Sequence, residues 1–552
     1  MPAHRTPVRR GADIDLPSTT VTSAPARGAA RRAAAVAGIV AILGAGACSA
    51  TTSTGTGETA SDASSVSGAP ASVAAASTAS DAGAGAALLA ANVDAPDVDD
   101  GAWSVDDAVA IELTGAGAEV ASSAVVADGS TVTITAPGTY VVSGTLDDGQ
   151  LVVDSAADGT VRVVLDGATI HSSTTAALAV ADADDAVVVL AEGSSNTLSD
   201  SERADAGERA AAGDDVDVPN AALFSMADLT IAGSGALQVT GAEADGIASK
   251  DGLTIAGGTI EIDAADDAVR GKDVVAIAGG SVTARAGGDG ITADNDTDAD
   301  AGYVWISGGT VAIDAGADGI DAATDAVLSG GDVTVAAADD AVHTEVAIAV
   351  DGGTVEVTEA YEGLESAAIA LTGGTVALHT ADDAVNVVGG DLVISGGDLA
   401  VDSGGDGIDV NGSVTMQGGT LVVDGPSQQN NGALDYDGTW TQTGGSLVAT
   451  GSAGMLAAPG TSSSQSSLVA TFAAQPAGST VRVFGADGTE LLAVSPTKSY
   501  ASIVVSVPGL VDGEDYSVTV DGTTVATTTT ADAATVAASG RRGPGGGARP
   551  GG

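Results

Sequence analysis

The sequence of 552 residues is poor in cysteine, in aromatic side chains and in bases. Its 1 cysteine excludes a disulfide within the chain, and 3 phenylalanines among 2% aromatic residues exclude a core built on large rings. The 18 lysines and arginines stand against 74 aspartates and glutamates, which gives a formal net charge of −56. Binding to nucleic acid needs a basic surface, so the composition excludes a nucleic-acid partner. The 4 histidines lie far apart in the sequence, which argues against a zinc site.

What the sequence does contain is a pair of glycines that returns about every 22 residues. The spacing is nearly constant apart from two longer gaps, and the pairs begin at Gly257, Gly279, Gly308, Gly330, Gly352, Gly373, Gly396, Gly418 and Gly444. A fixed period of this size indicates one structural unit that is stacked on copies of itself. Glycine suits a corner of such a unit because it reaches positive φ without penalty.

Apolar residues surround each glycine pair with a spacing of two, which is the alternation of a β-strand. In one unit, Val304 and Ile306 precede the pair, Val311 and Ile313 follow it, and Ile320 comes later as part of a third strand. Three short strands per repeat and no helical pattern predict an all-β fold, a right-handed single-stranded parallel β-helix with about 22 residues per coil. A leucine-rich repeat has a similar period, but it would need a Leu-Asn pattern and helical segments, which are absent.

The segment 1–48 predicts export. It combines arginines with an uncharged apolar run, Ala33–Ala47, which is typical of a signal peptide and shorter than the about 20 residues of a membrane span. Cys48 follows small residues in a pattern that resembles a bacterial lipobox, although Ala45 stands where that motif usually has leucine. We therefore expect a lipoprotein on the cell surface, lipidated at Cys48. The alternative is an ordinary signal peptide with a bystander cysteine.

The rest of the chain divides by composition. We expect a flexible Ala/Ser/Thr linker at 49–92, an N-terminal cap with the first coils at 93–240, the regular β-helix at 241–455, a small C-terminal β cap or module at 456–535, and a disordered tail at 536–552.

An acidic residue precedes nearly every glycine pair by half a repeat. Asp289 is the exception, because an insertion follows it, and the full series is Asp245, Asp267, Asp289, Asp318, Asp340, Glu362, Asp383 and Asp406. Stacked coils rise by about 4.8 Å, so neighbouring charges repel by roughly 3 kcal/mol at an effective dielectric constant near 20. Hydrogen bonds to turn amides, shared protons, basic partners or divalent cations would each relieve this repulsion. Strand alternation does not tell whether these side chains point outward or tuck into the corner.

Aspartates are densest from Asp263 to Asp300, where there are 9 of them, beside an insertion that begins at Asp294. Closely spaced oxygen ligands suit Ca²⁺, which takes about six to eight oxygens in loose geometry. We therefore expect Ca²⁺ as the cofactor, with ligands drawn from Asp245, Asp266, Asp267, Asp273, Asp289, Asp294, Asp296 and Asp298. In the later coils, from Asp318 to Asp406, the favoured interpretation is aspartate as a simple turn former.

Basic and aromatic residues next to this stretch predict a carbohydrate site. Lys250 and Lys272 are one repeat apart, so they should stack, and Arg270 lies beside them. Such a positive spot suits the carboxylates of an acidic sugar polymer, although charge balance for neighbouring aspartates explains it equally well. Trp305 lies between two inward positions, so it should face solvent with Tyr303 and offer a surface on which sugar rings stack.

Six sequence runs resemble those of bacterial cell-surface carbohydrate-binding β-helix proteins, and the resemblance covers roughly residues 100–525. These runs are Gly138–Gly144, Val163–Gly167, Asn196–Asp200, Asp228–Ile231, Asp245–Asp251 and Asp266–Asp273. The resemblance implies a calcium-containing, pectate-lyase-like fold that binds cellulose and polygalacturonate. The family often has Asp-Asp-Gly where this chain has Ala268 in the third position.

Three functions remain open at this point. The first is calcium-dependent binding of an acidic or cellulosic polysaccharide by an exported, lipid-anchored monomer, without catalysis. The second is a β-eliminating polyuronate lyase, in which Lys272 or Lys250 would act as the base and Ca²⁺ would acidify the substrate proton. The third is a structural wall spacer or adhesin. We prefer binding, because the many nearby acids oppose the lowered lysine pKa that a catalytic base would need.

Overall fold

The computed structural model describes residues 83–95, 98, 101–201 and 219–530. The expected signal segment with Cys48, the linker up to residue 82 and the tail 536–552 lie outside these residues. The chain divides into two units, Met1–Ile39 and Val40–Gly552, and every described residue belongs to the second. No helix in the described part of the chain has both the length and the apolar character that crossing a bilayer requires.

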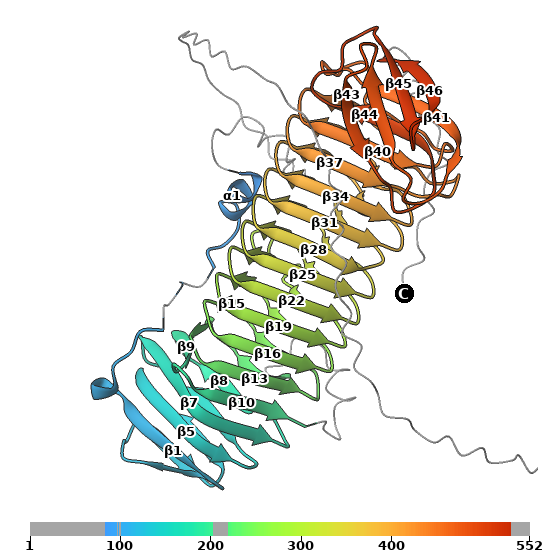
Figure 1. Cartoon of the computed structure of the whole chain (residues 1–552). Helices are drawn as coiled ribbons and strands as arrows, with labels where there is room; N and C mark the ends of the chain where they lie inside the picture. The colour runs from blue at the N-terminus through green and yellow to red at the C-terminus, as the bar shows by residue number, and fades with distance from the viewer. Residues whose placement is uncertain (1–82, 96–97, 99–100, 202–218, 531–552) are drawn as a thin grey trace, which may run out of the picture. The chain divides into compact units, whose positions relative to one another are not determined.

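The described chain is all-β, with 2% helix, and its parallel coils stack into a β-solenoid of about 13 turns spaced about 23 residues apart. Figure 1 shows these coils as a series of parallel arrows that continue from the first strands to the last coil. The predicted fold class is therefore confirmed. Each regular coil contains three strands, and equivalent strands of successive coils stack into three columns. The position of a side chain on these columns determines where it lies on the solenoid.

Column one belongs to the large sheet and contains ten strands in the regular coils. They are β12 (Leu229–Gly233), β15 (Gly252–Ile255), β18 (Val274–Ile277), β21 (Tyr303–Ile306), β24 (Asp325–Leu328), β27 (Ala347–Val350), β30 (Ile369–Leu371), β33 (Leu392–Ile394), β36 (Val414–Met416) and β39 (Trp440–Gln442).

Column two follows the glycine corner in each coil and belongs to the same sheet. It contains β10 (Ser195–Asp200), β13 (Ala236–Gly241), β16 (Thr259–Ala264), β19 (Ser281–Ala286), β22 (Thr310–Ala315), β25 (Asp332–Ala337), β28 (Thr354–Glu359), β31 (Thr375–Thr380), β34 (Asp398–Ser403), β37 (Thr420–Asp424) and β40 (Ser446–Gly451).

Column three forms a separate sheet of short strands and begins just after each acidic position. Its members are β11 (Ala221–Ser225), β14 (Asp245–Ser249), β17 (Val269–Gly271), β20 (Ile291–Ala293), β23 (Ile320–Ala322), β26 (Val342–Thr344), β29 (Leu364–Ser366), β32 (Val385–Val387), β35 (Ile408–Val410) and β38 (Asp435–Tyr436).

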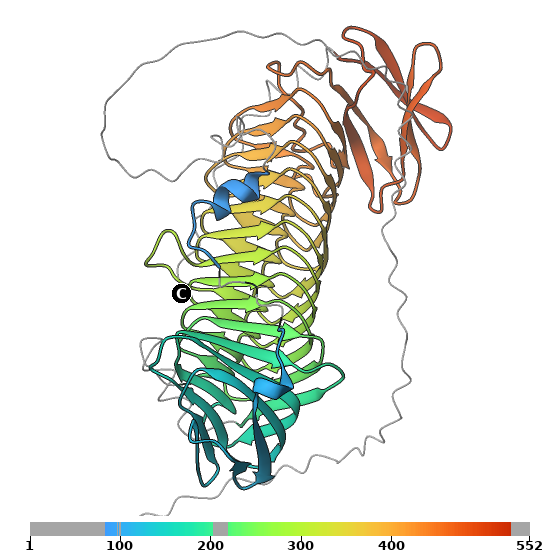
Figure 2. The same cartoon turned by 90° about the vertical axis from the view of Figure 1, so that its left-hand side faces the viewer.

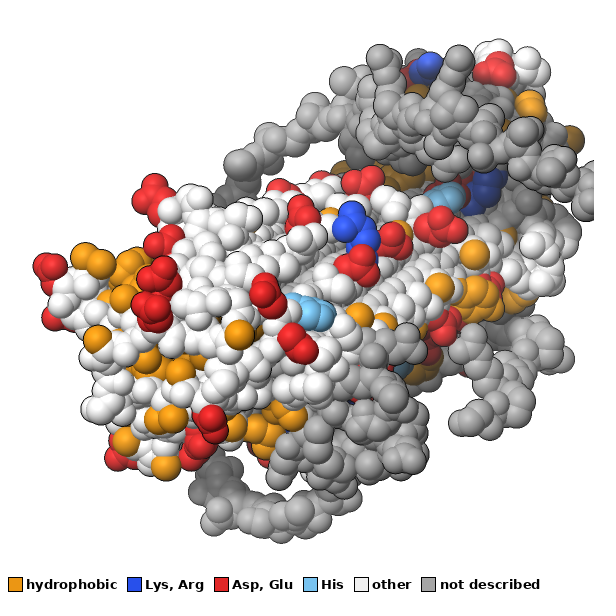
Figure 3. All heavy atoms as spheres, turned by 90° about the horizontal axis from the view of Figure 1, so that it is seen from below, with side chains coloured by type: hydrophobic (Ala, Val, Ile, Leu, Met, Phe, Trp, Pro, Cys, Tyr) orange, Lys and Arg blue, Asp and Glu red, His pale blue; other side chains and the backbone are white. Residues whose placement is uncertain are grey.

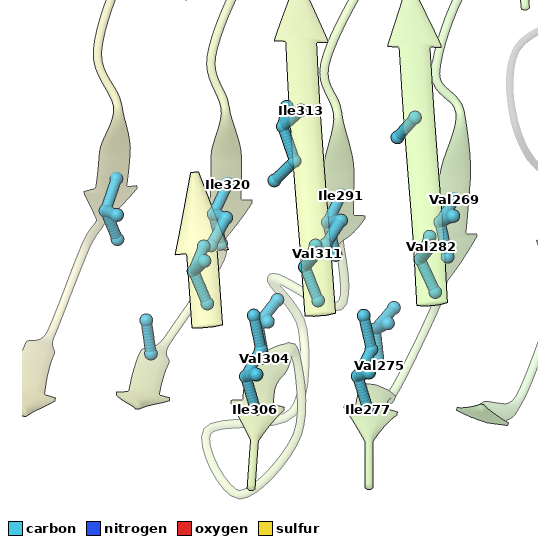
Figure 4. Close-up of a cluster of buried hydrophobic side chains, with 14 of the residues drawn as sticks. Val269, Val275, Ile277, Val282, Ile291, Val304, Ile306, Val311, Ile313 and Ile320 are labelled. Atoms are coloured by element: carbon cyan, nitrogen blue, oxygen red, sulfur yellow. The ribbon is translucent and has the colours of Figure 1, made fainter. Parts of the chain in front are cut away.

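The interior is filled by the aliphatic positions that the spacing of two predicts. Figure 4 shows Val304 and Ile306 from β21, Val311 and Ile313 from β22, and Ile320 from β23 directed into the space between the three columns. All five are buried. Each aliphatic side chain lies over its equivalent in the next coil, so the core is continuous along the stack and needs no large aromatic rings.

Both ends of the stack are paired with further strands. The first coils are built from β1 (Val109–Gly115), β2 (Ala118–Val120), β3 (Val125–Asp128), β4 (Thr131–Ile134), β5 (Gly138–Leu146), β6 (Gln150–Asp154), β7 (Thr160–Ser172), β8 (Leu178–Asp182) and β9 (Asp185–Leu190), with a short 3₁₀ helix at Val105–Asp107. β1 pairs in parallel with β5 and antiparallel with β2. The short antiparallel strand β2 covers part of the outer edge of β1, which makes that end less available for pairing with a further coil or a second chain.

At the other end, β40 pairs antiparallel with β44 instead of with a further coil. The C-terminal strands are β41 (Leu468–Gln475), β42 (Val481–Gly485), β43 (Glu490–Val494), β44 (Tyr500–Ser506), β45 (Asp515–Val520) and β46 (Thr523–Thr529). Four of them, β42, β43, β45 and β46, form their own antiparallel sheet over a separate small core.

Part of the expected linker is ordered. Residues 83–95, called the N-terminal strap below, contain the helix α1 (Ala84–Leu89) and lie on the outer side of column one, where α1 contacts β24 and β27. Figure 2 shows α1 against the side of the coils. Backbone and side-chain hydrogen bonds fix the strap: Gly85 N to Asp351 Oδ2 at 3.0 Å, Asn92 Nδ2 to Asp325 Oδ2 at 3.0 Å, and Val93 N to Asp300 O at 2.6 Å.

The second glycine of each pair has the positive φ that the corner was predicted to need. Gly353 has φ of 74°, and a Cβ at this position would lie 2.5 Å from the carbonyl oxygen of Gly331 in the coil before it. The stack therefore requires glycine here for two reasons, the backbone conformation and the close approach of the neighbouring coil.

We expect Gly353→Ala to destabilise the solenoid by at least about 1–2 kcal/mol, because left-handed φ alone has that cost for a residue with a Cβ. The matched control is Gly389→Ala, since a Cβ at Gly389 meets no atom within 4 Å and its φ lies outside the left-handed range. Urea denaturation followed by circular dichroism measures the difference. Equal midpoints for the two variants would contradict the corner geometry.

Candidate carboxylate ladder and metal sites

The repeated acidic residues stack as predicted, and they tuck into the corner between columns two and three. In most coils, one carboxylate oxygen accepts a hydrogen bond from the backbone amide of the equivalent residue in the next coil. These bonds are Asp289 N to Asp267 Oδ1 at 2.8 Å, Asp318 N to Asp289 Oδ1 at 2.9 Å, Asp340 N to Asp318 Oδ1 at 2.8 Å, and Asp406 N to Asp383 Oδ1 at 2.5 Å. A weaker bond joins Asp267 N to Asp245 Oδ1 at 3.4 Å. The series is called the carboxylate ladder below.

Burial gives the ladder unusual proton affinities, because it penalises the charged form of each carboxyl group. Desolvation raises the pKa of most ladder residues well above the usual range, and neighbouring acids add to the rise. The pKa values are about 8 for Asp245, about 7 for Asp267, about 6 for Asp318, about 7 for Asp340, about 8 for Glu362, about 7 for Asp383 and about 7 for Asp406. Near neutral pH, a part of these carboxyl groups is therefore protonated, which reduces the repulsion along the ladder in addition to the amide hydrogen bonds.

A second polar ladder runs beside the first, and the sequence patterns did not reveal it. It lies at the middle position of each column-three strand, just after the carboxylate ladder in the chain. In stacking order it contains Arg270, Thr292, Asp321, His343, Glu365, Asn386, Asp409 and Asp435. The residue type varies along this column, with four acids among the eight residues, so no single residue type marks it. Only the strand alternation, with Ile320 and Ala322 inward, places Asp321 on the outer side.

Arg270 occupies the place where calcium was expected. Its guanidinium lies 3.9 Å from Asp245 Oδ2 and 3.9 Å from Asp267 Oδ2, and it donates a short hydrogen bond to Asp294 Oδ2. Three of the predicted metal ligands therefore already face a permanent cation. A divalent ion between the same carboxylates would meet the positive charge of Arg270.

The other predicted ligands are dispersed. The side chains of Asp266, Asp296 and Asp298 are exposed, and Asp273 Oδ1 accepts a hydrogen bond from Asn295 Nδ2 at 2.6 Å. Asp289 is half-buried and belongs to the carboxylate ladder. The eight residues therefore do not converge on one point.

Three groups of potential metal ligands lie further along the stack, within the described residues. In each group, one ligand atom per residue lies within 4.8 Å of the others, and the groups are Asp318, Asp321 and His343; Asp340, Glu362 and Glu365; and Asp383, Asp406 and Asp409. Each group joins the carboxylate ladder to the second ladder. The interpretation of these aspartates as simple turn formers stays a prediction, and the second ladder places further potential ligands beside them.

His343 makes the first of these groups different from the others. Its Nδ1 lies 2.8 Å from Asp321 Oδ1, and this carboxylate raises the pKa of His343 to about 9. A protonated imidazole cannot bind a metal and supplies its own positive charge. This group therefore resembles the Arg270 position, where the protein neutralises its own acids.

The second group, Asp340, Glu362 and Glu365, contains only carboxylates and is the least satisfied. Asp340 is 8% exposed, and its Oδ1 has no hydrogen-bond partner. The ladder amide bond to Asp340 is missing in the coil whose β-bulge shifts the register between β25 and β28 at Val335/Ala336, and the next rung of this ladder is Glu362 instead of an aspartate. A buried carboxylate oxygen without a partner is costly and calls for a proton or a cation.

Lys250 and Lys272 lie on adjacent coils, as predicted. Ser249 pairs with Gly271 in the register of β14 and β17, so the lysine that follows each strand lies next to the other. Both lysines are half-buried. Their role in binding a sugar polymer stays a prediction.

Tyr303 and Trp305 differ from the expectation of an exposed aromatic surface. They do point to the outer side of β21, but the N-terminal strap covers them. Tyr303 is 2% exposed and donates a hydrogen bond from its hydroxyl to Val93 O at 2.8 Å. Trp305 is half-buried with Leu89, and its Nε1 donates to Ser329 Oγ at 3.0 Å. The strand alternation was correct, but it could not show that residues classed as linker would return to this face.

Most of the charged side chains on the visible face are acidic. In the view of Figure 3, red acidic side chains are scattered over the described surface, and blue basic ones are few.

Comparisons with known proteins show which proteins this chain resembles. Residues 128–384 match the family model of carbohydrate-binding domain-containing proteins. A carbohydrate-binding domain-containing protein of Acetivibrio thermocellus is 35% identical over 133 residues, which are 24% of this chain and 45% of that relative. The chain thus spans less than half the length of the curated relative it matches. A solved structure of the polysaccharide lyase-like protein from C. thermocellum, a gadolinium derivative, shares 30% sequence identity over 45% of this chain and 94% of that chain, with a TM-score of 0.36.

The family match supports a carbohydrate-binding protein, as the sequence resemblance implied. The matched residues include the carboxylate ladder from Asp245 to Asp383 and the group of Asp340, Glu362 and Glu365.

The raised pKa values predict a characteristic pH dependence in the absence of divalent cations. An unfolded aspartate titrates at about 3.9, so between about pH 4 and pH 8 the folded chain binds more protons than the unfolded chain. Stability must then fall as pH rises through this window. We expect a lower melting temperature in chelator at about pH 8 than at about pH 5, and the difference should persist in high salt because buried groups are weakly screened. A melting temperature that rises over this range would contradict the burial of the ladder.

Arg270→Gln removes the cation that faces Asp245, Asp267 and Asp294. We expect a loss of about 3 kcal/mol at neutral pH, because the partners of a broken buried ion pair are left uncompensated. Added Ca²⁺ should recover part of this loss in the variant only. The control is Arg285→Gln, whose side chain is exposed. Denaturant midpoints with and without Ca²⁺ test this, and equal midpoints for the two variants would show that Arg270 does not neutralise the ladder.

Proposed function

We propose that the chain binds polysaccharide without catalysis, and that divalent cations, Ca²⁺ above all, connect its carboxylates to an acidic polymer. The observation that carries the proposal is the group of Asp340, Glu362 and Glu365, a partly buried set of three carboxylates inside the residues that match the carbohydrate-binding family. The family match supports the carbohydrate, and the unsatisfied Asp340 Oδ1 supports the cation.

The chemistry of this group suits calcium better than other common metals. It offers only carboxylate oxygens, with neither imidazole nor thiolate, and Ca²⁺ prefers hard oxygen ligands in flexible geometry. Glu362 Oε2 also accepts a hydrogen bond from Asn386 Nδ2 at 2.7 Å, which orients its carboxylate. Three protein carboxylates leave positions for water or for a ligand from outside, since Ca²⁺ takes about six to eight oxygens.

The net charge of the chain predicts different requirements for binding acidic and neutral polymers. A chain with a formal net charge of −56 repels a polyuronate unless a cation lies between the two. Binding to polygalacturonate should therefore require Ca²⁺, whereas binding to neutral cellulose should survive a chelator. We favour the acidic polymer, because a bridging cation would also satisfy Asp340.

Export and lipid anchoring at Cys48 are part of the same proposal and rest on the sequence alone. A surface location would bring the carbohydrate-binding coils to extracellular polymers. Fractionation of cells that express the Cys48→Ser variant tests it, because loss of the lipid should release the protein from the membrane fraction.

Affinity electrophoresis in gels with polygalacturonate tests the binding directly. We expect retardation with Ca²⁺ and none with chelator, and we expect the double variant Asp340→Asn/Glu362→Gln to lose at least tenfold in affinity, equivalent to about 1.4 kcal/mol. The matched control is Asp332→Asn, an exposed acid outside the three metal-ligand groups.

Two outcomes would overturn the proposal. Retardation that is the same in chelator would remove the role of the cation. Unsaturated uronate ends that absorb ultraviolet light, formed by the wild type and lost in Lys272→Ala, would replace binding with the lyase function.

A further inference from the structure

One coil departs from the repeat at several places on the same corner. β28 carries the β-bulge, so that Ala336 pairs with Glu359 and Thr358 is the additional residue. Glu362 replaces the aspartate of the carboxylate ladder, and Tyr361 comes directly before it. Bulges in sheets commonly mark places where a side chain is redirected for a function.

Tyr361 is out of place in its own column. The residues stacked at this position, joined by backbone hydrogen bonds from coil to coil, are Asp266, Gly288, Ala317, Asp339, Tyr361, Asp382 and Gly405. All the others are small or acidic. Tyr361 is 37% exposed and is the only aromatic residue among the large apolar side chains that are exposed in the described part of the chain.

A single large side chain in a column of small ones leaves a hollow beside it. The hollow has a volume of about 340 Å³ and is lined by Tyr361 and by four residues of the two preceding coils, namely Gly316, Ala317, Ala338 and Asp339. The Tyr361 hydroxyl points away along the stack, where it donates a hydrogen bond to Asp382 Oδ2 in the next coil at 2.6 Å, and the ring itself lines the hollow. The hollow thus combines an aromatic wall, an apolar floor and a carboxylate at its rim.

We infer that this hollow is a subsite for one pyranose ring of the polysaccharide. The C–H face of a sugar ring packs on an aromatic side chain, and its hydroxyl groups donate hydrogen bonds to carboxylates such as Asp339. The volume of the hollow lies at the lower end of the range for ligand pockets, which suits a shallow site for one ring. The inference rests on the proposed polysaccharide binding and deepens it by naming where the polymer is held.

The position of the hollow links it to the metal-ligand group. Asp339 precedes Asp340 and Tyr361 precedes Glu362, so two of the three turns that line the hollow also supply the carboxylates. A uronate ring on Tyr361 would therefore lie next to the group that we propose for Ca²⁺. An occupied hollow explains why an aromatic residue is exposed at this corner and not covered as Tyr303 is.

Four variants test the subsite by affinity electrophoresis, with polygalacturonate plus Ca²⁺ and with hydroxyethyl cellulose as probes. Tyr361→Ala should weaken binding to the retained polymer about tenfold, and Tyr361→Phe, which keeps the ring, should stay within about twofold of the wild type. Ala338→Gln fills the hollow from an exposed position without removing the tyrosine, and it should also weaken binding. Val388→Ala removes another exposed apolar side chain and should change nothing.

Unchanged melting temperatures exclude misfolding as the cause of weaker binding. If the wild type is retarded and both Tyr361→Ala and Ala338→Gln bind as tightly, the subsite is overturned while polysaccharide binding stands. If neither probe retards the wild type, the proposed function fails and the subsite fails with it.

Discussion

Axial register is the constraint on which the rest of this structure depends. Each coil repeats the one before it closely enough for equivalent residues to lie one strand spacing apart, about 4.8 Å. The register aligns aliphatic side chains into a continuous core and glycines into a tight corner. It also aligns acids, which no folded chain would bring so close without compensation. The structure compensates in several ways: amide hydrogen bonds between ladder rungs, raised pKa values, Arg270 at one coil and protonated His343 at another.

The exception to this compensation is more informative than the rule. Around Asp340, the amide bond is missing in the coil that carries the bulge of β28, and the group itself contains no base, although the charge of His343 in the neighbouring group lowers the pKa of Asp340. The same coil exposes Tyr361 beside a hollow. A stack of nearly identical units has no intrinsic reason to depart from its repeat at three features of one corner. A shared external partner, a cation together with a sugar ring, accounts for all of them.

Periodicity predicted the solenoid, its inward positions and the stacking of the acids, because each depends only on the spacing of residues along one coil. It could not predict which carboxylates lack a partner, since that depends on a one-residue bulge. The second ladder was missed because its residues, such as Arg270 and Asn386, share a position but differ in residue type. Crowding of aspartates indicated calcium near Asp294, yet Arg270 already supplies a cation there. Composition also classed residues 83–92 of the strap as linker and Val93 as the start of the N-terminal cap, so the burial of Tyr303 under the strap could only come from the structure.

Long-wavelength anomalous diffraction from crystals that contain Ca²⁺ at neutral pH tests the central claim most directly. The account predicts an anomalous peak among the carboxylates of Asp340, Glu362 and Glu365, and none between Asp245 and Asp267 beside Arg270. An empty Asp340 group, with ions bound at the Arg270 position instead, would contradict it.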